Sequence, residues 1–218
     1  MDTLLIYGAS GAGKEIADLA QCINQQNKRW NEICFIDDDL QKGKVFYARD
    51  VMSFEKAQEL QKHKETECII SIGEPAIRQK LFDKCSRANF KMTTLIAPTA
   101  IVSGTAKIGK GVIISRHVFV SSDCEIGNNV LLQPTCKIFH DSVIKENSVI
   151  SSFVAVAGNC AVGGNAYAGI GAMIREKVKI GDETIIVVVN DIPGCMIAIG
   201  NPARAIKPNE NKRIFKGE

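Results

Sequence analysis

The sequence predicts two consecutive folds: a Rossmann-like α/β unit of the βαβαβ type over residues 1–94, and a left-handed parallel β-helix of hexapeptide repeats over residues 95–218. Two observations carry this prediction. In about the first ninety residues, apolar runs alternate with amphipathic segments, as strands and crossover helices do in a parallel sheet. From Ile96 onward, an aliphatic residue recurs at every sixth position instead.

The N-terminal unit contains three expected strands and three expected helices. The strands are predicted at residues 3–7, 33–36 and 67–72, because these short runs are largely apolar. The helices are predicted at residues 11–27, 53–63 and 75–88. Ser53 is a residue type that caps helix N-termini, and Pro75 suits the first turn of a helix. These elements predict a small parallel sheet with crossover helices.

The C-terminal repeat is too regular for a helix. Steps of six from Ile96 to Ile186 meet an apolar residue every time, and a small residue stands four positions after most of these anchors. A helix with 3.6 residues per turn would spread such anchors around its whole surface. A triangular coil of three hexads points them inward instead. Glycines directly after the anchors, such as Gly109 and Gly127, are expected to permit the backbone angles of the corners.

Composition excludes several classes of protein. The formal charge is only +3, and the lysines and arginines are spread along the chain. We therefore expect no nucleic-acid or membrane-surface partner. Without a long apolar stretch or a basic leader, the chain is expected to be cytoplasmic and to have no membrane span. The eight cysteines form no C-x-x-C pair and are expected to be free thiols. Cys124, Cys136 and Cys160 fall on the small corner positions, where a thiol is a compact filler.

A glycine-rich loop, residues 8–15, joins the first strand to the first helix. Its sequence GASGAGKE matches a P-loop except that Glu15 replaces the Mg²⁺-binding hydroxyl, and its glycine spacing differs from the dinucleotide fingerprint. Asp37, Asp38 and Gly73 follow the next two strands at the same edge of the sheet. We expect a nucleotide-like ligand there. The alternative is a tight turn beside a solvated acidic loop.

The three histidines do not predict a metal site. His63 ends a highly polar helix, and His117 and His140 are 23 residues apart, which does not superpose on coils of 18 residues. The pair His140–Asp141 is more suggestive, because a neighbouring carboxylate can orient an imidazole for proton transfer. Taken alone, such a pair on a coil surface is also compatible with a structural role.

Five motifs together resemble a known family. They are the GASGAG loop, IDD at residues 36–38, SIGEPAIR at residues 71–78, HD at residues 140–141 and GNPARAIK at residues 200–207. This combination resembles the bacterial nucleotide-sugar N-acetyltransferases and sialic acid O-acetyltransferases, over about residues 3–208. The resemblance implies a homotrimer, acetyl-CoA as donor, and active sites in clefts between adjacent coils.

The resemblance also implies roles for individual residues. His140 matches the general base and Asp141 the carboxylate that activates it. The backbone N–H of Gly158 matches a group that holds the thioester carbonyl or its oxyanion, and Ile170 falls where the acetyl-CoA arm passes. The positions that match the nucleotide-binding end are Ser10, Gly11, Ala12, Asp37, Asp38 and Gly73.

The leading interpretation is an acetyl-CoA-dependent N-acetyltransferase that acts on a nucleotide-linked amino sugar, such as a UDP-4-amino sugar, by direct transfer. A sialic acid O-acetyltransferase is the close alternative. A non-catalytic β-helix trimer without CoA binding is the other, because the chain departs from the family. Ala12 stands where relatives often carry histidine, and Val149 where some relatives carry a second one. The stretch from about Ile186 to Asp191 is about four residues short and lacks the usual glycines.

Overall fold

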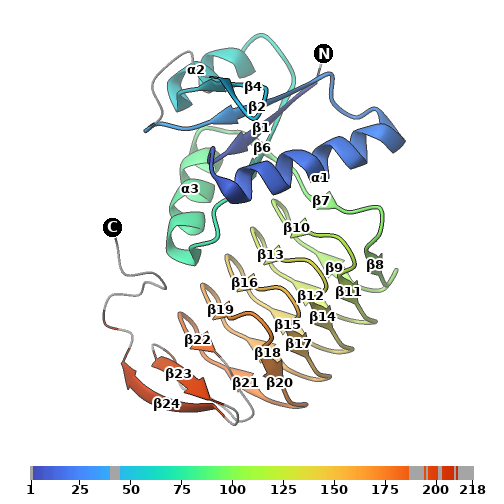
Figure 1. Cartoon of the computed structure of the whole chain (residues 1–218), viewed down its shortest axis with the longest axis vertical. Helices are drawn as coiled ribbons and strands as arrows, with labels where there is room; N and C mark the ends of the chain where they lie inside the picture. The colour runs from blue at the N-terminus through green and yellow to red at the C-terminus, as the bar shows by residue number, and fades with distance from the viewer. Residues whose placement is uncertain are drawn as a thin grey trace.

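The computed structural model describes residues 2–39, 45–186, 194, 196–200, 203–208 and 210. Both predicted folds are present, with the α/β part at one end of the β-helix (Figure 1). The chain passes directly from the last strand of the first part, β6 (Lys91–Met92), to the first strand of the coils, β7 (Leu95–Ile96).

The N-terminal sheet has six strands in the order β3-β4-β2-β1-β5-β6. The central strand β1 (Thr3–Tyr7) pairs in parallel with β2 (Glu32–Ile36) and with β5 (Thr66–Ile70). The outer strands β4 (Arg49–Met52) and β6 are also parallel, and β3 (Val45–Phe46) forms an antiparallel hairpin with β4. The sequence did not predict β3, β4 and β6, because none of them is a sustained apolar run.

Three helices cover the two faces of this sheet. Helix α1 (Gly11–Asn27) packs with one set of alternate strand residues, such as Ile6 and Phe35. Helices α2 (Phe54–Gln61) and α3 (Pro75–Arg87) pack with the other set, such as Leu5 and Cys68. The predicted cap is confirmed, since Ser53 accepts a hydrogen bond from the backbone N–H of Lys56.

The coils have three faces, and each face is a parallel β-sheet in which a strand pairs with the strand 18 residues later. Face one contains β7, β10 (Ile113–Ile114), β13 (Leu131–Leu132), β16 (Val149–Ile150), β19 (Tyr167–Ala168) and β22 (Ile185–Ile186). Face two contains β8 (Ile101–Val102), β11 (Phe119–Val120), β14 (Lys137–Ile138), β17 (Ala155–Val156) and β20 (Met173–Ile174). Face three contains β9 (Lys107–Ile108), β12 (Glu125–Ile126), β15 (Val143–Ile144), β18 (Ala161–Val162) and β21 (Lys179–Ile180).

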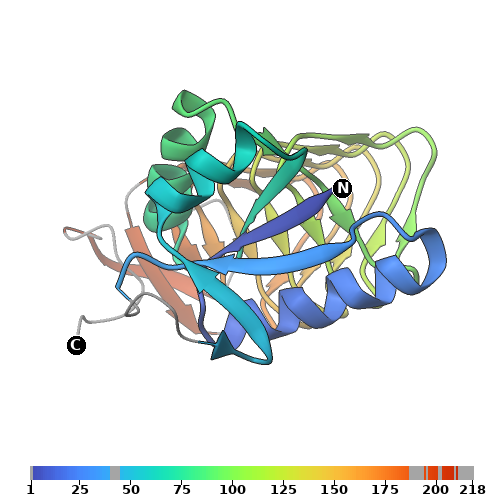
Figure 2. The same ribbon diagram turned by 90° about the horizontal axis from the view of Figure 1, so that it is seen from above.

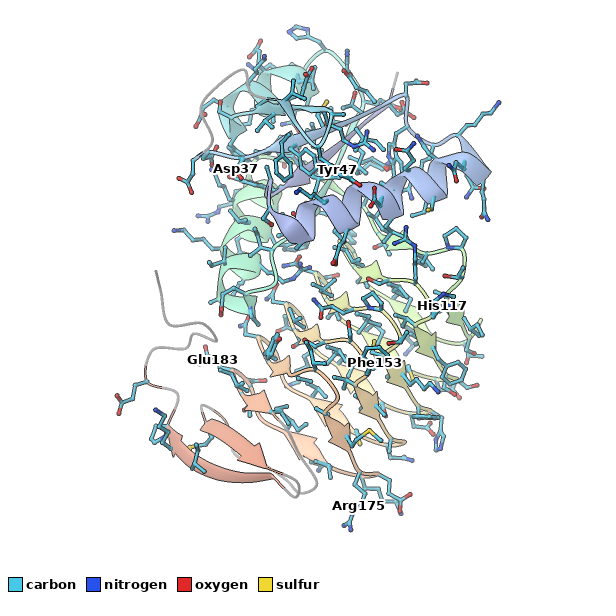
Figure 3. All side chains as sticks on the ribbon, viewed as in Figure 1. Asp37, Tyr47, His117, Phe153, Arg175 and Glu183 are labelled. Atoms are coloured by element: carbon cyan, nitrogen blue, oxygen red, sulfur yellow. The ribbon has the colours of Figure 1, made fainter. Side chains whose placement is uncertain are left out.

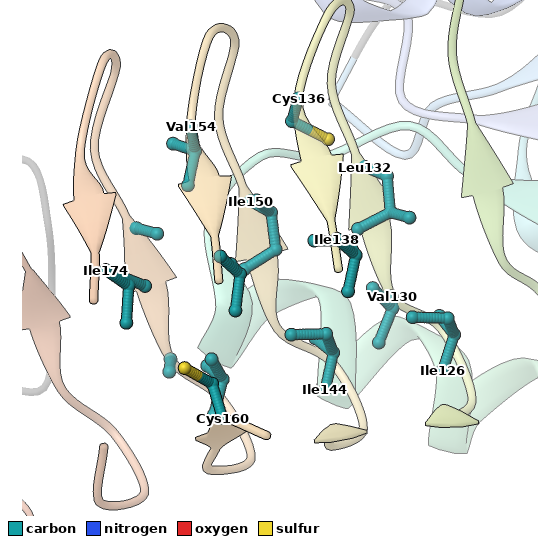
Figure 4. Packing of buried hydrophobic residues seen from close by; sticks show 14 of the residues in the cluster. Ile126, Val130, Leu132, Cys136, Ile138, Ile144, Ile150, Val154, Cys160 and Ile174 are labelled. Carbon is teal, nitrogen blue, oxygen red and sulfur yellow. The ribbon is translucent and has the colours of Figure 1, made fainter. Parts of the chain in front are cut away.

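The anchors of the hexads fill the interior of the coils, as predicted (Figure 4). Cys124, Cys136 and Cys160 are buried at the corners among them, and the seven cysteines that the structure describes form no disulfide. The first anchor is an exception to the prediction. Ile96 is 41% exposed, because β7 is the end strand of face one and no earlier coil covers it.

The expected role of the glycines after the anchors is wrong. The positive φ angles of the corners fall two residues after these glycine positions. They occur at every sixth residue from Gly111 to Glu183, and most of these residues are not glycine. Gly109 and Gly127 are needed for a different reason. A Cβ on either would lie within 2.8 Å of backbone atoms of the next coil, so these glycines permit close stacking of coils.

The two parts of the chain meet on the outer side of face one. Leu95, Ile113, Leu131 and Val149 point outward there and form one apolar cluster with the buried side of α1. Figures 1 and 2 show α1 lying across this end of the coils. These four residues recur every 18 positions, and the same positions on face three are Lys107, Glu125, Val143 and Ala161. On face one the outward positions are therefore apolar without exception, and the first domain buries them.

After β22 the described chain resumes with β23 (Met196–Gly200) and β24 (Ala203–Pro208). These two strands form an antiparallel hairpin that extends face one, a feature the repeat did not predict. Residues 187–193, where the sequence predicts a shortened coil, lie outside the described residues. Within the described part of the chain, no helix combines the length and apolarity that crossing a bilayer requires.

Candidate active site

The corners of the coils carry the candidate catalytic residues. We call the turns after faces one, two and three the first, second and third corners. His140 follows β14 and therefore lies on the second corner, together with Asp141. Gly158 follows β17, one coil later, and lies on the same corner.

His140 and Asp141 form the expected pair. The His140 Nδ1 lies 2.8 Å from Oδ2 of Asp141, and both side chains are more than half exposed. When Nδ1 carries the proton and donates a hydrogen bond to the carboxylate, Nε2 is left as a hydrogen-bond acceptor. Asp141 occupies the positive-φ position of the turn, at 58°, which places its carboxylate beside the ring. The pair has the donor and acceptor arrangement of a general base.

Gly158 lies directly beneath the imidazole. A Cβ on Gly158 would come within 2.6 Å of the His140 Cε1 and 2.7 Å of Nε2, so the absent side chain makes room for the ring. The backbone N–H of Gly158 donates to no acceptor among the described residues. An N–H without a partner among the described residues, on a glycine that lies against a histidine ring, is a suitable donor for a developing oxyanion.

The turns that carry His140 and Gly158 are tied to each other. The Ser142 hydroxyl donates to the backbone oxygen of Ala157 at 2.9 Å and accepts from the N–H of Cys160 at 3.1 Å. The N–H of Asn159 donates to the His140 oxygen at 2.9 Å. These bonds bracket Gly158 and hold its backbone against the ring.

The glycine-rich loop is held close to the end of β5. Gly8 has a φ of 116°, and a Cβ there would lie 2.6 Å from Cδ1 of Ile72. The Ser71 hydroxyl donates to the backbone oxygens of Tyr7 and Gly8. Gly13 approaches the Gly8 oxygen so closely that it has no room for a side chain. The loop therefore has a defined shape at the N-terminus of α1.

The remaining predicted loop positions are open. Ser10 is the exposed N-cap of α1 and makes no side-chain capping bond, and a Cβ on Gly11 or Gly73 would meet nothing within 4 Å. The first N–H groups of a helix have no partner within the helix and favour an anion. This part of the structure has space and donors for a phosphate group.

Asp37 and Asp38 differ in their contacts. Asp37 accepts the N–H of Ala9 at 2.9 Å, so it borders the glycine-rich loop, and Figure 3 shows it at the left-hand side of the α/β domain. Asp38 accepts from the Tyr7 hydroxyl at 2.6 Å, from Lys84 Nζ at 2.9 Å and from the N–H of Phe54 at 2.9 Å. Asp38 thus joins β1, α2 and α3, whereas Asp37 shapes the loop.

The pKa values around Asp38 follow from these bonds. Burial alone would raise the pKa of the Asp38 carboxyl, but the hydrogen bonds from Tyr7 and Lys84 outweigh burial and lower it. Burial and the hydrogen bond to Asp38 raise the pKa of Tyr7 well above its ordinary value. Asp38 is therefore an ionised carboxylate with three donors.

A cavity of about 190 Å³ lies between the two domains. It is lined by α1, by the end of β5 and by the first corner of the coils, through Ala12, Glu15, Ser71, Ser115, Arg116 and Gln133 among others. Our sequence reasoning missed Glu15, Arg116 and Gln133 as site residues. For Arg116 and Gln133 the signal was the period, because Ser115 and Gln133 are 18 residues apart and so share one corner with Arg116. Glu15 lies on α1, outside the repeat.

One chain does not bring all the predicted residues together. The cavity and the predicted donor contact Ile170, which is 72% exposed, belong to the first corner. His140, Asp141 and Gly158 belong to the second. Figure 3 shows His117 and Phe153, which also lie on the first corner. Among the described residues, no group of three or more His, Cys, Asp or Glu side chains is placed to hold a metal ion.

Comparison with known proteins supports a relationship over nearly the whole chain. Residues 3–85 match the PglD N-terminal domain family. A GDP-perosamine N-acetyltransferase of Escherichia coli is 29% identical over 219 residues, which covers 93% of this chain and 96% of that protein.

Two solved structures have the same fold. The acetyltransferase domain of PglB from Neisseria gonorrhoeae, in complex with acetyl coenzyme A, is 27% identical with a TM-score of 0.86, and the match covers 94% of this chain and 98% of that one. PerB from Caulobacter crescentus, in complex with CoA and GDP-perosamine, is 26% identical with a TM-score of 0.86 and covers 94% and 97%.

Proposed function

Because the chain belongs to the nucleotide-sugar N-acetyltransferases that join a PglD-type N-terminal domain to a hexapeptide β-helix, we propose that it transfers the acetyl group of acetyl-CoA to the amino group of a nucleotide-linked sugar. The observation that carries this proposal is the placement of His140. Its ring is oriented by Asp141 and lies over Gly158, whose N–H has no acceptor in the described part of the chain.

These groups supply the two functions that direct acetyl transfer needs. The sugar amine attacks the thioester carbonyl carbon while the His140 Nε2 removes a proton from the amine nitrogen. The Gly158 N–H stabilises the negative charge that develops on the carbonyl oxygen. The carbon–sulfur bond then breaks, and the CoA sulfur leaves with a proton from the imidazolium. The products are an amide and free CoA, without a covalent enzyme intermediate.

The glycine-rich loop is the proposed site for the nucleotide end of the acceptor. Free N–H groups at the start of α1, the open Ser10 hydroxyl and the space beside Gly11, Ala12 and Gly73 suit a diphosphate. Asp37 borders this loop and is the better candidate for a contact to the nucleoside, because all of the contacts of Asp38 brace the domain. The cavity at Ala12 leads from the loop toward the coils.

The separation of the two corners supports an active site shared between copies of the chain, in a homotrimer. Face two joins the first corner to the second, and its outer side carries exposed apolar residues. Ile101, Phe153 at the neighbouring first corner, and Met173 are each between 61% and 66% exposed. Phe119 packs on Phe139, the residue before His140, at a ring distance of 5.9 Å. A second copy covering this apolar side would bring a first corner against the second corner.

The proposed reaction also implies a compartment. Disulfides are rare in proteins of a reducing environment, and the seven cysteines that the structure describes form none. Acetyl-CoA is a cytoplasmic metabolite, so we infer that the protein acts in the cytoplasm.

A substrate screen tests the proposal. Purified protein is titrated with acetyl-CoA by calorimetry and then assayed for thiol release with GDP-, UDP- and dTDP-linked 4-amino sugars, CMP-sialic acid and free sialic acid. We expect acetyl-CoA binding and turnover with an amino sugar, and a loss of about 100-fold or more in His140→Ala. If only sialic acid substrates were turned over, the acceptor group would be a hydroxyl, and the proposed amine acceptor would be wrong. The absence of acetyl-CoA binding at millimolar concentration would contradict an enzymatic role.

The shared site has its own test. Met173→Glu places a charge on the exposed apolar side of face two, and Glu125→Lys, on face three, is the control for a surface charge change. Light scattering is expected to show a trimer for the parent and the control, and smaller species with reduced turnover for Met173→Glu. A parent that is monomeric and fully active would refute the shared site.

A further inference from the structure

Arg78 is a fully buried cation at the junction of the two domains. It lies in the first turn of α3, with none of its surface exposed. Burial lowers the pKa of its guanidinium to about 9, and no carboxylate among the described residues pairs with it. An unpaired buried charge is unfavourable unless hydrogen bonds satisfy it. Its presence therefore needs an explanation in its contacts.

Five hydrogen bonds use the whole guanidinium. Nη1 donates to the backbone oxygens of Ile70 at 2.8 Å and Ile72 at 2.9 Å. Nε and Nη2 donate to the backbone oxygen of Asn129 at 3.0 and 2.7 Å, and Nη2 donates to its Oδ1 at 2.9 Å. An arginine has five N–H donors in a rigid fork, so every donor is satisfied. One edge of the fork holds the first domain and the other holds the β-helix.

The first-domain edge is part of the glycine-rich loop's support. Ile70 ends β5, and Ser71 and Ile72 follow it. The Ser71 hydroxyl holds the oxygens of Tyr7 and Gly8, and the Ile72 side chain fills the space beside Gly8. Gly73, a proposed acceptor contact, is the next residue. Arg78 thus holds the loop that is proposed to bind the nucleotide.

The β-helix edge is equally well supported. Asn129 lies on the third corner with a φ of 58°, and its Nδ2 donates to Oδ1 of Asn147, one coil later, at 2.9 Å. Both residues are buried. The same helix α3 also packs against the third corner at Gly111, where a Cβ would lie 2.9 Å from the Phe82 ring. This corner is therefore a firm base for the guanidinium.

We infer that Arg78 is a positioning residue, which sets the distance between the acceptor-binding loop and the coils that carry His140. This inference rests on the proposed function. The apolar contact of α1 with face one gives the junction affinity but little directional constraint, whereas five bonds in one rigid fork fix orientation. Because misplacement of reacting groups by about 1 Å can reduce rates about 100-fold, the junction controls turnover.

Two variants and one matched control test the inference. Arg78→Lys keeps a positive charge but lacks the planar fork. Asn129→Gly keeps a residue that tolerates positive φ and removes the Oδ1 acceptor of Arg78, together with the Nδ2 donor to Asn147. Asn165→Gly makes the same change at the equivalent position of the third corner, two coils further on, without touching Arg78.

Steady-state kinetics and calorimetry are measured with acetyl-CoA and an active nucleotide amino sugar. We expect kcat to fall about tenfold or more in Arg78→Lys, and less in Asn129→Gly, while the Kd for acetyl-CoA stays within about twofold of the parent and Asn165→Gly behaves as the parent. Loss of acetyl-CoA binding in Arg78→Lys would show a general folding role instead. Equal losses in Asn129→Gly and Asn165→Gly would also overturn the inference.

Hydrogen exchange followed by mass spectrometry tests the junction without any substrate. Arg78→Lys is expected to speed exchange in peptides covering residues 70–78 and 126–131, and to leave residues 155–165 unchanged. Unaltered exchange in both junction peptides would overturn the inference. A parent that binds acetyl-CoA but acetylates no sugar would refute the proposed function, and the exchange result would still decide whether Arg78 couples the domains.

Discussion

The imidazole of His140 lies over the backbone of Gly158, with its Cε1 2.6 Å from the point that a Cβ on Gly158 would occupy. Gly158→Ala is therefore expected to push the ring away from its place beside the Gly158 N–H. Since a misplaced general base loses most of its effect, we expect turnover to fall about 100-fold. Gly158 does not have a positive φ, so the backbone accepts alanine and the thermal melting temperature should change little.

Gly164→Ala provides the control for this change. Gly164 occupies the same turn position on the third corner, where a Cβ would lie 3.3 Å from the flexible end of Glu146 and at an ordinary contact distance, 3.5 Å, from its backbone oxygen. Turnover of Gly164→Ala should match the parent. Parental turnover in Gly158→Ala would show that the observed position of the ring is not the catalytic one.

Asp141→Asn tests the orienting role of the carboxylate. Asparagine has the same shape and tolerates the φ of 58°, but it no longer carries the charge that stabilises an imidazolium. We expect kcat to fall by about tenfold or more with little change in stability, because the carboxylate is more than half exposed. Asp141→Gly, which also suits the backbone angle, should lower kcat at least as much. Full activity in both variants would show that His140 works without the Asp141 carboxylate, which would contradict the orienting role.

Substitutions of Asp37 and Asp38 are expected to affect different properties of the protein. Asp37→Ala removes the acceptor of the Ala9 N–H and should raise the KM for the nucleotide sugar, without affecting the KM for acetyl-CoA. Asp38→Asn should instead lower stability by about 1 kcal/mol, a value reduced for its partial exposure, because Lys84 loses its charged partner. Kinetics and urea unfolding separate the two effects. A larger rise in KM for Asp38→Asn would reverse the assignment.

The repeated half of the fold was predictable from sequence because one physical requirement recurs sixteen times. Each coil must place an aliphatic anchor inward at every sixth residue, so the pattern survives local variation. The strands β4 and β6 lacked such repetition. They are short, they begin with Arg49 and Lys91, and they form because an existing parallel sheet offers them a hydrogen-bonding edge.

The site was predictable only where residues lie close along the chain or one full coil apart. His140 and Asp141 are adjacent in the sequence. Gly158 was singled out by the family resemblance, and its distance of 18 residues from His140 agrees with a position on the same corner. Ile170 is 30 residues beyond His140, which places it on another corner. The contacts of Arg78 with Asn129 depend on how α3 docks on the coils, and no local pattern encodes that docking.

Glu67 gives a prediction for the pH dependence of the first domain. This buried carboxyl accepts hydrogen bonds from Lys91 Nζ at 2.8 Å and Trp30 Nε1 at 2.8 Å, and Arg29 Nη2 lies at 3.0 Å. Burial alone would raise its pKa, but the bonds from Lys91 and Trp30 and the charge of Arg29 lower it. A carboxyl with a lowered pKa in the folded state stabilises the protein above its unfolded pKa, and this stability is lost as the pH falls through the folded value.

We therefore expect the free energy of unfolding of the first domain to fall by about 1–3 kcal/mol as the pH drops below about 4, and expect a weaker pH dependence in Glu67→Gln. Trp30 is the only tryptophan in the chain, so its fluorescence during urea unfolding follows this domain. Glu59→Gln is the control, because Glu59 forms a surface pair with Lys62 that contributes little to stability. If Glu67→Gln keeps the pH dependence of the parent, other carboxylates such as Asp38 must control acid unfolding.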